Sequence, residues 1–132
     1  MGNPMSLFDS HVLLWSLAFP ERLGKRLWAK IDAQSSFLFS PLSIFELQLV
    51  AMKGKLPPLP ESLSKLALEA GMTELPFDAR AAEDAQHLRQ LLGTDPFDWM
   101  LVSQAQSAGC DFYTADLRLL GLGLPFIKDA TL

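Results

Sequence analysis

The chain alternates short apolar segments, which are typical of buried strands, with longer segments of helical periodicity. The strand-like segments are residues 5–9, 36–40, 72–76, 111–116 and, as an edge strand, 125–127. Alternation of this kind predicts an α/β fold with a mainly parallel sheet of four to five strands and helices on both faces. In such sheets ligands bind beyond the carboxyl ends of the strands, so the strand ends are where a site is expected.

The length of 132 residues fits one domain with one core. Hydrophobic residues make up 49% of the chain, which suits strands that are buried on both faces. We expect residues 5–130 to form this single domain. Residues 1–4 are interpreted as a leader or as residues added in cloning, with Met5 as the natural start.

The net charge of −4 argues against broad, nonspecific binding to nucleic-acid duplexes. That argument weakens if several acids share one pocket with metal ions, because the remaining surface is then near neutral. Cys110 is the single cysteine, so no internal disulfide forms and a reducing compartment is expected. No secretion signal or membrane span is visible, and the sequence therefore predicts a cytoplasmic protein without a membrane partner.

Several helices have predicted boundaries. Ser10 is expected to cap the first helix, which Pro20 ends. Further helices are predicted over residues 21–33, 41–53, 61–70, 78–92 and 96–108. In the helix over 41–53, the stripe expected to face inward consists of Leu42, Phe45, Leu49 and Met52.

Four acids can be placed around one crevice. Asp9 and Asp116 stand at the carboxyl ends of predicted strands. Glu46 lies at the edge of the inward stripe of its helix. Asp98 lies in the first turn of the helix that Asp95 caps, on the face that points inward. The sequence therefore predicts a shared acidic site.

Four carboxylates in one pocket repel one another, so they need a cation or raised pKa values. Mg²⁺ and Mn²⁺ prefer oxygen ligands and retain waters that can become nucleophiles. The matching reaction is phosphodiester hydrolysis, in which a metal-activated water attacks phosphorus and a metal stabilises the leaving oxygen.

Each acid also has a purely structural alternative. Asp9 can start the first helix, and Glu46 can lie at the rim of the core. Asp98 can be the far member of a capping box with Asp95. Asp116 can cap the segment that follows it. These roles do not exclude metal binding, because a strand-end acid can do both.

The motifs around these acids resemble those of PIN-domain proteins of the VapC toxin type. Residues 7–15, Leu-Phe-Asp-Ser-His-Val-Leu-Leu-Trp, are similar to the opening motif, and residues 43–47, Ser-Ile-Phe-Glu-Leu, to the second, which Gly-Lys-Leu at 54–56 follows. Residues 95–98, Asp-Pro-Phe-Asp, resemble the third motif, and residues 114–116, Thr-Ala-Asp, the fourth. The motifs follow in the family's order over residues 5–130.

This resemblance implies a PIN-like three-layer sandwich and a metal-dependent endoribonuclease, the toxin of a type II toxin–antitoxin system. It implies that the catalytic residues and ligands of Mg²⁺ or Mn²⁺ are Asp9, Glu46, Asp98 and Asp116, with Ser10 and Thr114 as supporting polar groups. The partners it implies are an RNA substrate, structured or tRNA-like, a cognate antitoxin protein and a second copy of the chain in a homodimer.

Three positions depart from the family's pattern. Ser10 stands where Thr is usual and keeps the hydroxyl. Trp99 follows Asp98 where the family often has Arg, which removes a phosphate or antitoxin contact. Gly93 occupies a place where His is often found.

Other functions fit the sequence less well. A PIN-fold interaction module with weak or no catalysis is the main alternative, motivated by the acidic charge, the apolar composition and Trp99. A phosphatase of the haloacid type needs a second Asp where His11 stands, and the acid and Lys pattern of a receiver domain is not found.

Overall fold

The computed structural model describes residues 3–33 and 35–132, and within them five strands form one parallel sheet. The strands are β1 (Met5–Phe8), β2 (Ser36–Phe39), β3 (Thr73–Glu74), β4 (Asp111–Thr114) and β5 (Ile127–Asp129). Their order across the sheet is β3-β2-β1-β4-β5, with every neighbouring pair parallel. The predicted sheet is confirmed, although β5 begins two residues later than expected.

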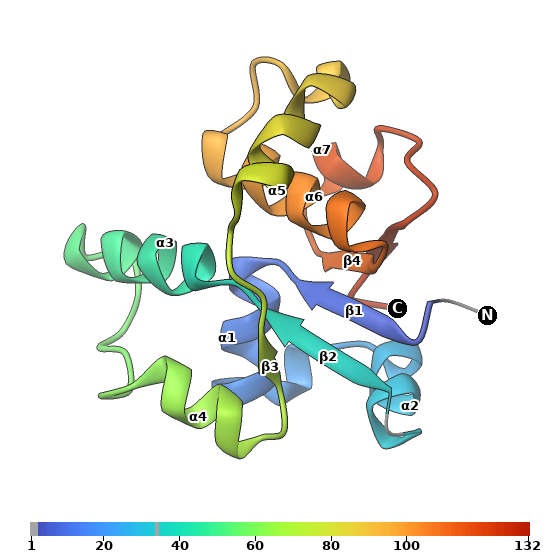
Figure 1. Cartoon of the computed structure of the whole chain (residues 1–132). Coiled ribbons are helices and arrows are strands. Elements are labelled where there is room, and N and C mark those ends of the chain that lie inside the picture. Colours follow the sequence, from blue (N-terminus) through green and yellow to red (C-terminus); the bar gives the residue numbers. More distant parts are fainter. Residues whose placement is uncertain (1–2, 34) are drawn as a thin grey trace.

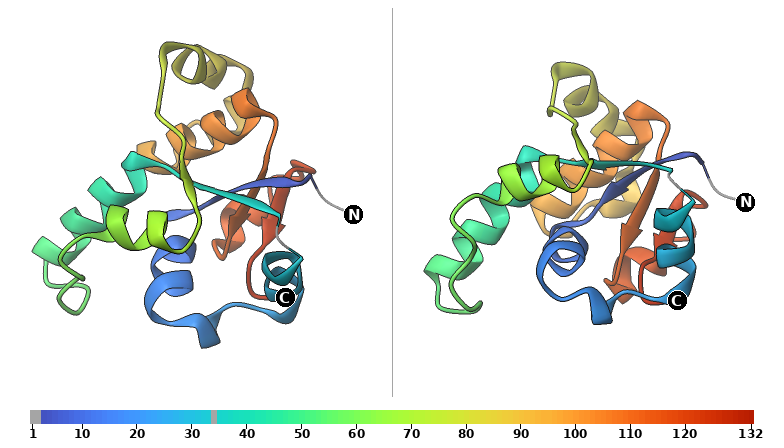
Figure 2. Two further views of the ribbon diagram at one scale, coloured as in Figure 1. Left: turned by 60° about the horizontal axis from the view of Figure 1, so that its bottom comes forward. Right: turned by 90° about the horizontal axis from the view of Figure 1, so that it is seen from below.

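Helices cover both faces of this sheet (Figures 1 and 2). One face carries α1 (Ser10–Ala18), α2 (Lys25–Asp32) and α4 (Leu63–Glu69). The other carries α5 (Ala79–Asp84), α6 (Pro96–Ala108) and α7 (Leu117–Leu120). The predicted three-layer α/β sandwich is therefore confirmed. Among the described helices, none combines the length and the hydrophobicity needed to cross a bilayer.

Alternating side chains of the central strands build two cores. Leu7, Leu38 and Phe112 point to the α6 side, and the pairing register places Leu7 beside both Leu38 and Phe112. Phe8 and Phe37 point the other way, against α1 and α2. Because both faces of the sheet are covered, successive residues such as Leu7 and Phe8 of β1 are apolar on both faces, and each such buried side chain contributes roughly 1.5–3 kcal/mol.

The centre of the sheet is its topological switch point. β1 pairs with β2 on one side and β4 on the other, so the connections that leave these strands diverge. Helix α3 (Pro41–Met52) continues from the carboxyl end of β2 beyond the sheet, where it contacts α1 and α6 (Figure 1). The carboxyl ends of β1 and β4 and the start of α3 therefore face the same region.

The predicted inward stripe of α3 is wrong for Phe45 and Met52, whereas Leu42 packs against the core as predicted. Phe45 is 55% exposed and Met52 is 74% exposed, whereas Leu47 is fully buried. Leu47 packs against Leu14 of α1 and Leu63 of α4. Because α3 extends past the sheet, it is covered only where it meets α1, α4 and α6, and Phe45 and Met52 remain exposed to solvent.

Two predicted helices are interrupted. The helix expected over 21–33 is a 3₁₀ turn (Pro20–Arg22) followed by α2, with Gly24 between them. The Gly24 N–H donates to the Ala130 carbonyl, and a Cβ at this position would lie 2.0 Å from the Leu132 carbonyl oxygen. The residues after β5 therefore pack closely against the backbone at Gly24, within the segment that the sequence predicts to be one continuous helix.

The helix expected over 78–92 ends early. It continues as two 3₁₀ turns, Ala85–His87 and Arg89–Leu91, which bring the buried side chains of Leu88 and Leu91 into the core beneath α6. Asp78 caps α5 by accepting a bond from the Ala81 N–H.

The interpretation of residues 1–4 as a leader stays a prediction. Residues 1 and 2 lie outside the described part of the chain. The Pro4 carbonyl accepts a bond from the Ser36 N–H, and the Asn3 N–H donates to the Asp111 carboxylate.

Substitution on α3 tests its orientation. We expect Leu47→Ala to lower the free energy of unfolding by about 2–5 kcal/mol, because it leaves a cavity between three helices. Met52→Ala on the same helix should change it by less than about 0.5 kcal/mol, because that side chain is exposed. Urea denaturation of both variants measures this difference, and equal losses would show that α3 is oriented otherwise.

Candidate active site

Asp9 follows β1 directly and is buried at the N-terminus of α1. Its Oδ1 accepts a bond of 2.7 Å from the Ser10 N–H, and its Oδ2 accepts one of 2.6 Å from the Thr114 hydroxyl on β4. Burial raises the pKa of this carboxyl, these two bonds lower it, and Asp116 raises it further. Asp9 therefore caps the helix and also joins the two central strands at their carboxyl ends.

Ser10 does not cap α1 as predicted. Because Asp9 takes that role, the Ser10 hydroxyl is free to donate a 2.5 Å bond to Oε1 of Glu46 on α3. Glu46 is half-buried, and burial followed by the charges of Asp9 and Asp95 raises its pKa. Ser10 thus links α1 to α3 and fixes the Glu46 carboxylate beside Asp9.

Asp98 lies in the first turn of α6, and its side chain is buried as predicted. Burial raises its pKa from 3.8 to about 7, together with the charges of Asp9, Glu46, Asp116 and Asp95. In the described residues no hydrogen bond to the Asp98 carboxylate accompanies this burial, so the alternative of a capping box with Asp95 is wrong. Asp95 caps α6 by accepting a bond from the Phe97 N–H.

Asp116 caps α7, because its Oδ1 accepts a hydrogen bond from the Arg118 N–H. Its own N–H donates to the Thr114 hydroxyl at 3.0 Å, and that hydroxyl donates in turn to Asp9. Thr114 therefore connects the acids that follow β1 and β4. Asp116 has the predicted capping role and still lies close enough to raise the pKa values of Asp9 and Asp98.

The structure brings all four predicted acids into one electrostatic cluster. Asp95 is a fifth member that sequence reasoning assigned only to capping, although its spacing of three residues from Asp98 on one helix places the two side by side. His11 also lies near this cluster, and its charge lowers the pKa values of Asp9 and Glu46. The cluster therefore has a strong excess of negative charge when its carboxyl groups are ionised.

The donor set of this cluster fits a hard divalent cation. It consists of carboxylate oxygens, two of them fixed by hydroxyl groups, and oxygen donors are those that Mg²⁺ and Mn²⁺ prefer. Over residues 3–33 and 35–132, no three Asp, Glu, His or Cys side chains already converge at the spacing of a finished metal site. Asp98 lies within electrostatic range of Asp9, Glu46 and Asp116, since each of these charges raises its pKa.

Of the three departures from the family pattern, Ser10 donates hydrogen bonds to two of these acids, whereas Trp99 and Gly93 do not. The Trp99 indole N–H donates to the Ala85 carbonyl at 3.2 Å, so this side chain packs between α6 and the segment after α5. Gly93 is exposed with a φ of +91°, a conformation that favours glycine. Neither residue supplies a charge to the acidic cluster. Cys110 is buried and its pKa is raised to about 11, which makes it an inert thiol.

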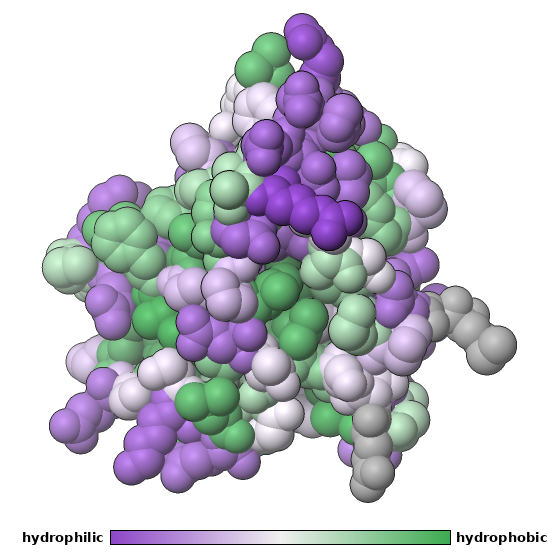
Figure 3. Space-filling view, in the orientation of Figure 1, coloured by the Kyte–Doolittle hydropathy of each residue, from purple (hydrophilic) through white to green (hydrophobic). Residues whose placement is uncertain are grey.

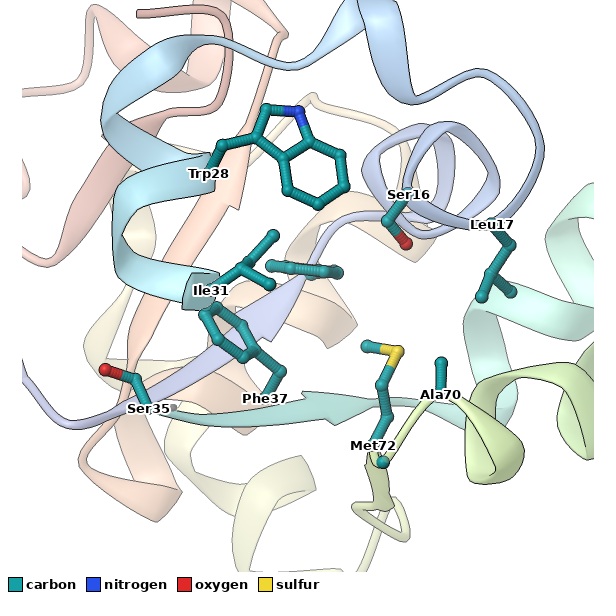
Figure 4. Close-up of a pocket in the computed structure, with 10 residues that line it drawn as sticks. Ser16, Leu17, Trp28, Ile31, Ser35, Phe37, Ala70 and Met72 are labelled. Carbon is teal, nitrogen blue, oxygen red and sulfur yellow. The ribbon is translucent and has the colours of Figure 1, made fainter. Parts of the chain in front are cut away.

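A separate apolar cavity of about 490 Å³ opens on the face of the sheet that α1 and α2 cover. Figure 4 shows Trp28 and Ile31 of α2 facing Leu17 of α1 and Met72 across it, with Phe37 of β2 on its floor. None of the four acids lines this cavity. It is therefore distinct from the candidate active site.

Comparisons with known proteins agree with this architecture. The sequence profile of the PIN domain family matches residues 6–123. VapBC from Salmonella typhimurium in its DNA-bound crystal structure is similar, with a TM-score of 0.65 and 18% identity over 95% of this chain and 97% of that one. VapBC2 from Rickettsia felis, bound to a promoter DNA fragment, gives a TM-score of 0.65 at 15% identity over 95% and 98%. A toxin–antitoxin complex from Klebsiella pneumoniae gives 0.62 at 18% over 95% and 97%.

No curated protein sequence matches the chain. The profile match covers most of the sequence, and the chain therefore belongs to the PIN domain family. PIN domains are generally nucleases, and as a class they generally use divalent metals.

The raised pKa of Asp98 predicts a pH-dependent stability. The folded protein keeps a proton on Asp98 that the unfolded chain releases near pH 3.8, so this stabilisation is present at low pH and is lost as the pH rises through about 7. In EDTA, the melting temperature of the wild type relative to that of Asp98→Asn should fall by about 3 °C or more between pH 5 and pH 8. Differential scanning calorimetry checks this, and a difference that is constant with pH would contradict it.

Proposed function

We propose that this protein is a metal-dependent endoribonuclease and the toxin component of a type II toxin–antitoxin system, acting in the cytoplasm. The observation that carries the proposal is the cluster of Asp9, Glu46, Asp98 and Asp116 at the switch point of a PIN-family sheet. The same four acids are the proposed ligands of Mg²⁺ or Mn²⁺. Toxin–antitoxin complexes among the structural neighbours support the biological role.

The residues of the site have separable roles in this proposal. Thr114 and Ser10 hold Asp9 and Glu46 in fixed orientations by hydrogen bonds, so that neither carboxylate has to reorganise when substrate binds. A bound divalent cation would supply a water of lowered pKa and neutralise charge on the phosphodiester. Asp98 accepts no hydrogen bond among the described residues, so its carboxylate oxygens are available to the cation.

The proposed partners follow from the same family. We propose an RNA substrate with structured or tRNA-like character, a cognate antitoxin protein and a homodimer. Complexes of the VapBC type among the similar structures support a protein partner. A short open reading frame for a small DNA-binding protein immediately upstream of the gene would support the antitoxin.

Cleavage assays on bulk tRNA and on an unstructured oligoribonucleotide test the activity. We expect cleavage with Mg²⁺ or Mn²⁺, loss of cleavage in EDTA, and a rate reduced by about 100-fold or more in Asp9→Asn and Asp98→Asn, because each removes a ligand charge. Asp78→Asn is the matched control, since Asn caps α5 as well as Asp does and the position lies outside the cluster.

We expect the Asp78→Asn variant to cleave RNA at the wild-type rate. Unchanged cleavage after either substitution in the cluster would exclude these acids as the catalytic residues, and no cleavage of either RNA by the wild type would exclude the nuclease.

A second candidate function is a PIN-fold interaction module with weak or no catalysis. The observation that favours it is the apolar cavity between α1, α2 and β2, because an exposed apolar hollow is a typical site for a protein partner. This candidate is preferred if the protein binds Mn²⁺ and a neighbour-encoded protein tightly but cleaves no RNA.

A further inference from the structure

Two aromatic side chains stand beside the acidic cluster. Phe45 of α3 immediately precedes Glu46, and Phe97 of α6 immediately precedes Asp98. Their rings contact each other, with centroids 5.9 Å apart and an interplanar angle of 68°. The two helices therefore bring one aromatic residue each to the place where they also bring one acid each.

This aromatic pair does not serve the cores. Neither ring belongs to the buried clusters on the two faces of the sheet or to the cluster around Leu47. Phe45 is 55% exposed, although it lies on a helix whose other side is well covered. Figure 3 shows hydrophobic surface gathered on the left, over the region that α3 occupies in Figure 1. A phenylalanine pair beside a polar site, with Phe45 exposed and Phe97 partly buried, is suited to a ligand with an apolar face.

The negative charge of the site indicates which part of an RNA ligand the aromatic pair contacts. Four other acids surround Asp98. The Trp99 side chain, which stands where the family often has Arg, packs against the segment after α5 and adds no positive charge. Without a cation, this part of the site therefore attracts a phosphate only weakly. Base stacking on aromatic rings is insensitive to this charge and is worth about 1–3 kcal/mol per base. A base can stack in this way only when it is unpaired.

We propose that Phe45 and Phe97 form a stacking platform for an unpaired RNA base next to the phosphodiester bond that is cleaved. The platform rests on the proposed nuclease function and adds to it the element that positions the substrate. It selects single-stranded segments, such as loops of a structured RNA, rather than duplexes. Phe45 and Phe97 are positioning residues, whereas the acids perform the chemistry.

Steady-state cleavage of an RNA that the wild type cuts tests the platform. We expect Phe45→Ala to raise KM about tenfold with little change in kcat, because stacking binds substrate and transition state alike. Phe45→Leu should show a similar loss, since leucine keeps the apolar volume but not the ring, whereas Phe45→Tyr should retain the wild-type KM. Met52→Ala, which removes another exposed apolar side chain from α3, is the matched control and should have no effect.

Substrates with a single abasic nucleotide identify the stacked base. At one position next to the cleaved bond, base removal should raise the wild-type KM but cause no further loss in Phe45→Ala, because the two changes remove the same interaction. At other positions the two losses should add.

Three results would overturn the platform. A wild-type KM in Phe45→Leu would remove the need for an aromatic ring while leaving the nuclease function intact. A change of oligomeric state in Phe45→Ala, measured by light scattering, would assign the pair to a contact between two copies of the chain. A wild type that cleaves no RNA would exclude the proposed function and the platform together.

Discussion

The burial of Asp9 at the end of β1 is the constraint on which the rest of the site depends. A carboxylate placed there loses most of its hydration, which raises its pKa and opposes ionisation. Part of that cost is offset by the Ser10 N–H at the helix N-terminus and by the Thr114 hydroxyl. Asp116 at the end of β4 adds to the remainder, and Asp9 in turn raises the pKa values of Glu46 on α3 and Asp98 on α6, an arrangement that a proton on Asp98 or an added cation can stabilise.

The fold explains why acids from distant segments meet here. The parallel order places the carboxyl ends of β1 and β4 side by side, and α3 leaves the end of β2 toward α1 and α6. Hydroxyl groups then connect the acids: Thr114 bridges Asp9 and the backbone of Asp116, and Ser10 bridges to Glu46. Packing of the two cores on either face holds these elements rigid, so the site is built on the scaffold rather than on loops.

Local chemistry made much of this predictable from the sequence. Apolar strand segments, the cap at Asp95 with Pro96 after it, and Gly109 at the end of α6 are short-range signals, and the structure confirms each. The predictions failed where contacts between segments far apart in the sequence determine the local structure. Gly24 interrupts a helix because the C-terminal segment packs on it, and Phe45 is exposed because α3 passes beyond the sheet. The partner of Ser10 could not be predicted either, since it depends on how α1 meets α3.

A crystal soaked in Mn²⁺ above pH 7 provides the most direct test of the shared cation, because Asp98 is then largely ionised. We predict an anomalous difference peak between the carboxylates of Asp9, Glu46, Asp98 and Asp116, with metal–oxygen distances of about 2.0–2.3 Å. An anomalous map that shows no peak among these four carboxylates under such conditions would contradict it.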